Sequence, residues 1–208
     1  MLNQLRQTVM PVKMGLARPI AATGIPPNLL TLLAVPLSLG AAGLILQGQP
    51  GWAFALALPS VLVDFVDGPV AKLQGRVTPY GNLLESVVDR VVEAALLAGL
   101  ASVFPLAAAS ALGCSTVVSY VKARTGLVIV SDNREWPGWG DRSDRVVLVL
   151  LSLLLLALGW RECAQLALWT VASLSAVGAV QRLIYARSLI QTGELLPYLR
   201  QDGQAQDR

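Results

Sequence analysis

Six long apolar stretches dominate the chain and restrict what it can fold into. Each approaches the roughly 20 helical residues needed to cross a hydrocarbon core of about 30 Å. They cover residues 29–47, 51–71, 83–103, 105–122, 145–160 and 164–185. Only 14% of the 208 residues are charged, and the mean hydropathy is +0.59. This is the composition of a polytopic membrane protein, not of a soluble domain.

Basic residues are concentrated in alternate connections between these stretches. The chain before the first stretch, the second-to-third and fourth-to-fifth connections and the C-terminal end hold nearly all of them, whereas the connections on the other side hold only Arg161. By the positive-inside rule, both termini and the acidic ends of the stretches face the cytoplasm. We therefore predict a multi-pass protein of the cell membrane. The net charge of +3 is explained by topology, without nucleic acid as a partner.

The two ends of the chain lie outside the apolar region. Residues 1–24 place apolar side chains at near-helical spacing with basic residues among them, which predicts an amphipathic helix on the cytoplasmic leaflet. A solvated tail is the alternative. Residues 191–208 are polar and are predicted to form a cytoplasmic tail. The predicted fold is an all-α integral membrane protein in which this interfacial helix precedes six transmembrane helices within residues 25–190.

Four carboxylates lie in or beside two neighbouring apolar stretches: Asp64 and Asp67, then Glu85 and Asp89. A carboxylate is costly at bilayer depth, so such a cluster indicates a bound cation. Spacings of three and four residues put each pair on one helix face, and Glu93 continues the second stripe. The chain has no histidine, and oxygen ligands alone favour Mg²⁺ or Mn²⁺ together with a phosphate-bearing substrate. Salt bridges to nearby basic residues are the alternative interpretation.

The same residues carry a resemblance to a known family. Residues 64–72 read D-F-V-D-G-P-V-A-K, and after eight more residues 81–89 read G-N-L-L-E-S-V-V-D. This resembles the signature of the CDP-alcohol phosphatidyltransferase family, D-x₂-D-G-x₂-A-R-x₈-G-x₃-D-x₃-D, with every spacing kept. Lys72 replaces the arginine and Glu85 replaces the third aspartate. Lysine lacks the planar fork that holds a pyrophosphate at two points, and glutamate sets its carboxylate one methylene further from the backbone.

The resemblance extends beyond this motif. Residues 27–31, P-N-L-L-T, are similar to the family's P-N-x-x-T element, which faces the nucleotide, and Thr78 matches a hydroxyl position that contacts the nucleotide phosphates. The residues implied for binding of the CDP-lipid are Asn28, Thr31, Gly68, Ala71, Lys72, Thr78 and Gly81. Gly68 and Ala71 are also small enough for a bulky ligand to approach the backbone between them.

The resemblance implies a reaction. The family moves a phosphatidyl group from CDP-diacylglycerol to an alcohol and releases CMP. By this resemblance, Asp64, Asp67, Glu85 and Asp89 would hold one or two Mg²⁺ or Mn²⁺ ions. Asp89 would also act as the catalytic base that takes the proton of the acceptor hydroxyl. Dimers are common in the family, and we expect a homodimer.

Basic residues near the cytoplasmic ends of the last three apolar stretches suit an acceptor that carries its own phosphate. They are Lys122, Arg124, Arg142, Arg145 and Arg182. The segments around Lys122 and Arg182 are similar to those of members that use inositol phosphate or glycerol phosphate. Contacts with anionic lipid headgroups are the alternative. For Arg182 we favour the functional interpretation, because this residue lies inside an otherwise apolar stretch.

Two other functions fit parts of the pattern. A cation-coupled transporter would use the carboxylates as its transport site, but it would place them near the bilayer midplane and often shows a repeat between chain halves. Here the acids gather near one end of their stretches and the sequence shows no obvious repeat. A regulatory family member, inactive through Lys72 and Glu85, is the second alternative. Intramembrane proteolysis by a Ser-His pair or an H-E-x-x-H site is excluded because histidine is absent.

Overall fold

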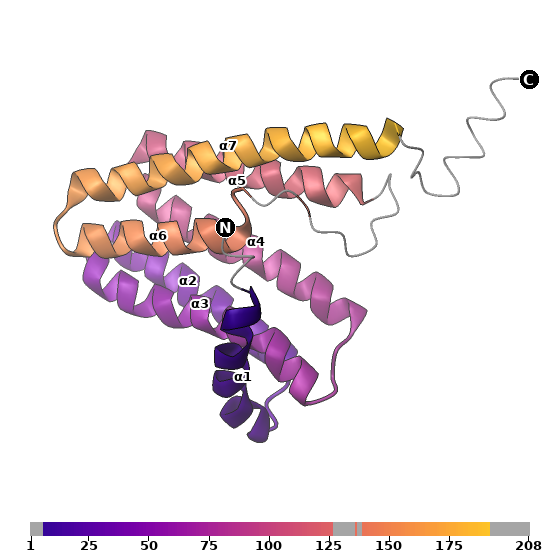
Figure 1. Cartoon of the computed structure of the whole chain (residues 1–208). Helices are drawn as coiled ribbons and strands as arrows, with labels where there is room; N and C mark the ends of the chain where they lie inside the picture. Colours follow the sequence, from indigo (N-terminus) through magenta and orange to yellow (C-terminus); the bar gives the residue numbers. More distant parts are fainter. Residues whose placement is uncertain (1–5, 127–135, 137–138, 192–208) are drawn as a thin grey trace, which may run out of the picture.

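The computed structural model describes residues 6–126, 136 and 139–191. All regular structure in these residues is helical (Figure 1). The helices are α1 (Arg6–Ala22), α2 (Pro27–Leu46), α3 (Pro50–Leu73), α4 (Pro79–Ala101), α5 (Pro105–Thr125), α6 (Arg142–Ala157) and α7 (Arg161–Gln191). Each of the six apolar stretches forms one helix, and α1 lies within the predicted N-terminal helix. The predicted tail beyond residue 191 lies outside the described residues.

Four of the helices, α2 to α5, begin with a proline. Proline suits the first helical position because its missing N–H would have no partner there. Gly48, between α2 and α3, has a φ of 71°, a left-handed value that lets the chain reverse within three residues. Short connections of this kind make neighbours of α2 and α3, of α4 and α5, and of α6 and α7.

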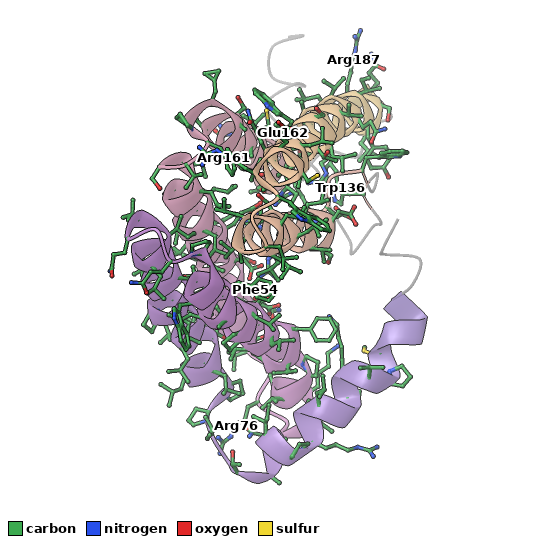
Figure 2. The ribbon with its side chains drawn as sticks, turned by 90° about the vertical axis from the view of Figure 1, so that its left-hand side faces the viewer. Phe54, Arg76, Trp136, Arg161, Glu162 and Arg187 are labelled. Atoms are coloured by element: carbon green, nitrogen blue, oxygen red, sulfur yellow. The ribbon has the colours of Figure 1, made fainter. Side chains whose placement is uncertain are left out.

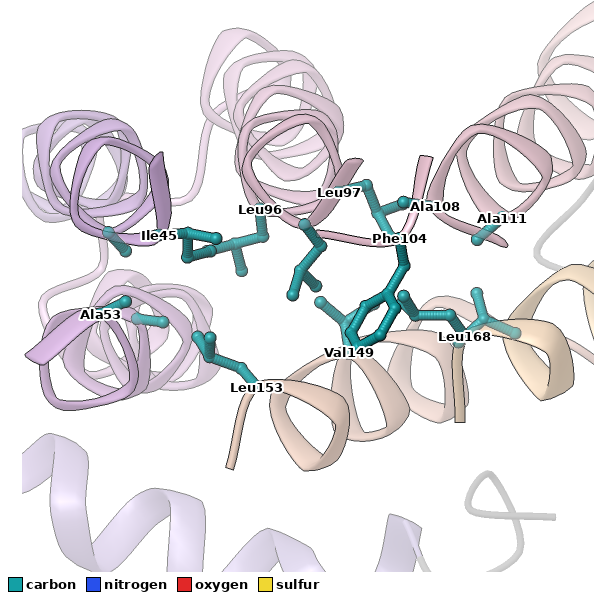
Figure 3. Packing of buried hydrophobic residues seen from close by; sticks show 14 of the residues in the cluster. Ile45, Ala53, Leu96, Leu97, Phe104, Ala108, Ala111, Val149, Leu153 and Leu168 are labelled. Atoms are coloured by element: carbon teal, nitrogen blue, oxygen red, sulfur yellow. The ribbon is translucent and has the colours of Figure 1, made fainter. Parts of the chain in front are cut away.

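The helices pack into one bundle around an apolar core. α2 packs against α3 and α4, α5 and α6 both pack against α7, and α3 contacts α6. Leu96 and Leu97 of α4 meet Val149 and Leu153 of α6 in this core (Figure 3). A Cβ atom on Gly99 would come 2.9 Å from the Cα atom of Ala42, so α4 and α2 approach closely because one residue lacks a side chain.

Four of the helices, α2, α3, α5 and α7, are long and apolar enough to cross a membrane. These apolar helices indicate a membrane protein whose regular structure, in the described residues, is helical. The other two predicted spans form helices that differ in physical character. α4 has 23 residues but carries several charges in its first half, and α6 has 16 residues with three charged side chains in its first turn. Crossing of the membrane by six helices stays a prediction.

Helix α1 stands apart from the other helices and packs mainly on α3 (Figure 1). Ala17 is completely buried in a small cluster with Leu30 of α2 and Val66 and Val70 of α3. On the same side, Nζ of Lys13 lies 3.9 Å from the ring centroid of Phe65. α1 is thus held against the end of α3 that carries Asp64 and Asp67.

Candidate active site

The four predicted carboxylates come from the C-terminal half of α3 and the N-terminal half of α4. Asp67 and Asp89 are 2% and 8% exposed, and Asp64 and Glu85 are half-buried. Asp64 lies close enough to Asp67, Glu85 and Asp89 to interact electrostatically with each of them. The acidic faces of α3 and α4 therefore lie close enough for one Arg142 nitrogen to contact both.

Asp67 is held by two short hydrogen bonds. The Thr31 hydroxyl on α2 donates to Oδ2 at 2.6 Å, and the backbone N–H of Gly68 donates to Oδ1 at 2.6 Å. Hydrogen bonds to an ionised group are the stronger kind in proteins. Thr31 was predicted to bind the nucleotide, but its observed partner is a carboxylate. In this structure Thr31 orients Asp67.

Arg142, in the first turn of α6, bridges two of the carboxylates. Its Nη2 atom lies 2.6 Å from Oδ2 of Asp64 and 2.6 Å from Oδ1 of Asp89. The packing of α6 against α3 brings this side chain to the acidic site. A residue predicted to bind the acceptor thus contacts two residues predicted to bind metal.

The carboxylates are not arranged as a ready-made metal cage. In the described part of the chain, no three acidic or cysteine side chains are grouped closely enough to hold an ion as they stand. The donor set nevertheless fits a hard cation. Its ligands are all oxygen atoms, Asp64 and Asp89 already hold one cationic group between them, and no described group donates a hydrogen bond to the buried Oδ1 of Asp64. Binding of an ion would require the Arg142 side chain to give way.

Three of the residues implied for nucleotide binding lie together at the start of α4. Thr78 precedes α4, and its hydroxyl accepts a hydrogen bond from the N–H of Gly81 at 3.0 Å. A Cβ atom on Gly81 would come 3.1 Å from Oγ1 of Thr78 and 3.3 Å from Oδ1 of Asn28. Around Gly68, by contrast, no described atom lies within 4 Å of the Cβ position, so its backbone faces open space. The exposed Lys72 ends the same face of α3.

A buried polar network lies behind the carboxylates. Arg145 donates from Nε and Nη2 to the two Glu93 oxygens at 2.6 and 3.1 Å, and from Nη1 to the carbonyl of Gly140 at 2.6 Å. Arg90 donates to Glu93 at 2.8 Å and to the Ser119 hydroxyl at 2.6 Å. This network joins α4, α5 and α6. Arg145, predicted to contact the acceptor, is 1% exposed and is engaged by protein groups.

Arg182 is engaged in a similar way. It is 3% exposed and donates to the carbonyl of Val118 at 2.9 Å and to Oδ1 of Asp141 at 2.5 Å. Lys122 and Arg124 are exposed at the end of α5. Of the five predicted acceptor residues, Arg142 is thus the one seen in direct contact with the four predicted metal ligands, through Asp64 and Asp89.

Several residues of this site were missed by sequence reasoning. They are Ser119, Gly140 and Asp141. Arg90 is one of the nearby basic residues of the salt-bridge interpretation, and it pairs with Glu93. Asp141 lies at the N-cap position of α6, but its side chain makes no capping hydrogen bond and instead accepts one from Arg182. Ser119 and Gly140 act through position alone, and no pattern in the sequence marks them.

The family profile of CDP-alcohol phosphatidyltransferases matches residues 25–181, which include the acidic site and α2 to most of α7. The chain belongs to the CDP-alcohol phosphatidyltransferase family. The match covers the four carboxylates, the residues around Thr78 and the basic residues of α5 to α6 in one continuous segment.

Several known proteins are similar to this chain over most of their length. A phosphatidylinositol phosphate synthase from Corynebacterium glutamicum is 33% identical over 174 residues, covering 77% of each chain. One from Mycolicibacterium smegmatis is 32% identical over 192 residues, covering 83% of this chain and 84% of its own. An archaetidylinositol phosphate synthase from Pyrococcus horikoshii is 27% identical over 198 residues, covering 93% of this chain and all of its own.

Solved structures of another CDP-alcohol phosphatidyltransferase are similar in fold. The phosphatidylinositol phosphate synthase of Mycobacterium tuberculosis with CDP-DAG bound superposes with a TM-score of 0.71 at 25% identity, covering 85% of this chain and 94% of that one. The same enzyme in complex with manganese and citrate also gives a TM-score of 0.71 at 25% identity, covering 84% and 88%.

Proposed function

We propose that this CDP-alcohol phosphatidyltransferase moves a phosphatidyl group from CDP-diacylglycerol to inositol phosphate, releases CMP and depends on a divalent metal ion. One observation carries the proposal: Asp64 and Asp89, from two helices, hold a single cationic group between them, and that group belongs to a residue suited to binding phosphate. The names of the relatives support inositol phosphate as the acceptor.

The metal would be held by Asp64, Asp67, Glu85 and Asp89, as one or two Mg²⁺ or Mn²⁺ ions. When bound, a divalent ion supplies positive charge that stabilises the pyrophosphate as the bond to CMP breaks. The manganese complex of the Mycobacterium tuberculosis enzyme supports this assignment. In this chain, Thr31 supports the site by fixing the orientation of Asp67.

The cytidine diphosphate would lie over the open backbone at Gly68 and Ala71, with Asn28, Thr78 and Gly81 at one end. Lys72 would contact the phosphates from the last turn of α3. A lysine offers a point charge in place of the arginine fork, so the nucleotide is gripped at one point instead of two.

Asp89 would be the general base. The acceptor hydroxyl oxygen forms a bond to the phosphorus next to diacylglycerol, the bond from that phosphorus to CMP breaks, and the hydroxyl proton passes to Asp89. The phosphate of the acceptor would be met by Arg142 and by the exposed Lys122 and Arg124. Arg145 and Arg182 would shape this region from behind, because their guanidinium groups are bound to protein atoms.

The proposal includes the arrangement in the membrane. Six helices, α2 to α7, would cross the cell membrane, with α1 on the cytoplasmic surface and the active site facing the cytoplasm. The distribution of basic residues supports this orientation. We expect a homodimer because dimers are common in the family, with contacts made by exposed apolar helix faces.

The test is CMP release by the purified full-length protein in detergent. CDP-diacylglycerol and Mn²⁺ or Mg²⁺ are supplied with one acceptor at a time: inositol phosphate, glycerol phosphate, free inositol or serine. We expect rapid release with inositol phosphate and loss of activity when a chelator removes the metal. Equal or faster release with free inositol or serine would overturn the proposed acceptor, and metal-independent turnover would overturn the proposed chemistry.

A further inference from the structure

Arg142 and Arg145 lie one turn apart on α6 but are bound in very different ways. Arg145 is 1% exposed, and its three donating nitrogens all reach hydrogen-bond acceptors. The Arg142 side chain is 27% exposed and reaches the carboxylates through one nitrogen, Nη2. No described group accepts a hydrogen bond from its buried Nε atom. Arg145 is therefore a fixed anchor, whereas Arg142 is held by a partial set of contacts.

The carboxylates that hold Arg142 are also incompletely satisfied. Oδ1 of Asp64 has no hydrogen-bond partner among the described residues, and the 2.6 Å contact between Nη2 and Oδ1 of Asp89 lacks hydrogen-bond geometry. One guanidinium nitrogen is shared between the two carboxylates. A buried polar atom without a partner is destabilising, so this arrangement leaves stabilisation to be gained.

The contact distances bound the space that a smaller cation would occupy in place of the guanidinium. Both carboxylate oxygens lie 2.6 Å from one nitrogen, so they are at most about 5.2 Å apart, twice that distance. A divalent ion bound at about 2.0–2.1 Å from each oxygen would need them within roughly 4.2 Å. Because 5.2 Å is an upper limit, at most a small side-chain adjustment would bring the two oxygens within this range once the guanidinium has left. Two positive charges would then face two negative ones.

The backbone around Arg142 would stay in place during such an exchange. Arg145 fixes the first turn of α6 to Glu93 of α4 and to the carbonyl of Gly140. A Cβ atom on Gly140 would come 2.6 Å from the carbonyl oxygen of Leu174, so this turn is also packed tightly on α7. Only the Arg142 side chain has to move, and its planar fork is then available to a phosphate group.

We propose that Arg142 is an internal counter-ion that links the metal site to the acceptor site. A divalent ion takes its place on Asp64 and Asp89, and the released guanidinium binds the phosphate of the acceptor. The inference rests on the proposed function, which supplies the metal and the phosphorylated acceptor. Because coupling between two ligands is reciprocal, metal raises the affinity for acceptor and acceptor raises the affinity for metal by the same factor.

Titration calorimetry of the full-length protein in detergent with Mn²⁺ tests the first half. Arg142→Gln removes the competitor, so Mn²⁺ should bind about tenfold more tightly than to the wild type, while Arg142→Lys should fall between them. The matched control is Arg187→Gln, which removes the same charge from an exposed position on α7 (Figure 2) and should leave Mn²⁺ affinity unchanged. The gain should persist in about 0.5 M NaCl, because screening weakens distant charges more than a direct contact.

Titration with inositol phosphate, with and without Mn²⁺, tests the second half. In the wild type and in Arg187→Gln, Mn²⁺ should increase acceptor affinity about tenfold, and in Arg142→Gln this increase should disappear. Unchanged or weaker Mn²⁺ binding by Arg142→Gln would overturn the inference while the proposed function stands. A wild-type protein that binds no Mn²⁺ would overturn both. Acceptor coupling that survives in Arg142→Gln would also overturn the inference.

Discussion

Arg145 on α6 and Glu93 on α4 form a buried two-point pair, with Nε–Oε1 and Nη2–Oε2 distances of 2.6 and 3.1 Å. The two residues are 52 positions apart in the sequence. Glu93 also accepts a hydrogen bond from Arg90, so one carboxylate balances two arginines. The pair sets the position of the first turn of α6, from which Arg142 reaches the acidic site.

Glu93→Gln should destabilise the protein strongly. Removal of one partner from a buried ion pair leaves an uncompensated charge, which typically costs about 3–5 kcal/mol. The apparent Tm in detergent should fall by several degrees. Glu162→Gln, which removes the same charge from the exposed start of α7, is the matched control and should leave it unchanged. Equal apparent Tm values for the two variants would contradict this role of Glu93.

Gly178→Ala should damage both stability and activity. A Cβ atom at Gly178 would lie 2.2 Å from the carbonyl oxygen of Trp139, so α7 and the segment before α6 must separate. Overpacking of this kind typically costs about 1–3 kcal/mol. Asp141 and Arg142 follow directly after this segment, so CMP release should fall as well.

The control for this glycine is Gly113→Ala on α5. No described atom lies within 4 Å of the Cβ position at Gly113, so the alanine has room. It should leave activity unchanged and raise stability slightly, because alanine favours the helix by about 1 kcal/mol over glycine. A Gly178→Ala protein as active and stable as Gly113→Ala would show that this close approach is unimportant.

The helices could be predicted because a membrane demands long apolar segments. All six apolar stretches became helices close to the expected positions. α4 is not among the helices apolar enough to be recognised as a span, because one of its faces carries Glu85, Asp89 and Glu93 in place of apolar residues. A helix that lines a polar site has less of the apolarity by which spans are recognised. Catalysis and membrane crossing therefore compete for the same positions.

The acidic site could be predicted from the spacing of its residues, but the roles of its arginines could not. Arg142 and Arg145 share one helix face and looked equivalent in the sequence. Which carboxylate each reaches depends on how α6 packs against α3 and α4. Glu93 continued the acidic stripe of α4, yet it turns towards Arg145 instead of joining Asp89.

Thr31→Val should weaken the metal site without unfolding the protein. Valine fills the same volume but cannot donate to Asp67. Hydrogen bonds to charged groups contribute about 1.5–3 kcal/mol, so kcat/KM should fall about 10- to 150-fold and more Mn²⁺ should be needed for half-maximal rate. Thr31→Ser keeps the hydroxyl and should retain most of the activity. If serine and valine are equally impaired, the hydroxyl is not the group that matters.

Lys72→Arg combined with Glu85→Asp restores the letters of the family signature. Because both native residues already carry the required charge, the wild-type protein should turn over before this change. The double variant should bind CDP-diacylglycerol more tightly through the arginine fork. CMP release assays compare the two proteins directly. Activity that appears only in the double variant would favour a regulatory role for the native chain.

Asp89→Asn should abolish turnover while leaving binding of CDP-diacylglycerol largely intact. Asparagine keeps the shape of the side chain but cannot accept the hydroxyl proton, and a general base typically contributes about 10²–10⁴-fold. The change also removes half of the charge that holds Arg142. A loss of rate with unchanged lipid binding separates the role of base from a role in the nucleotide pocket. Glu162→Gln controls for the lost charge, and an Asp89→Asn rate within tenfold of that control would remove the base assignment.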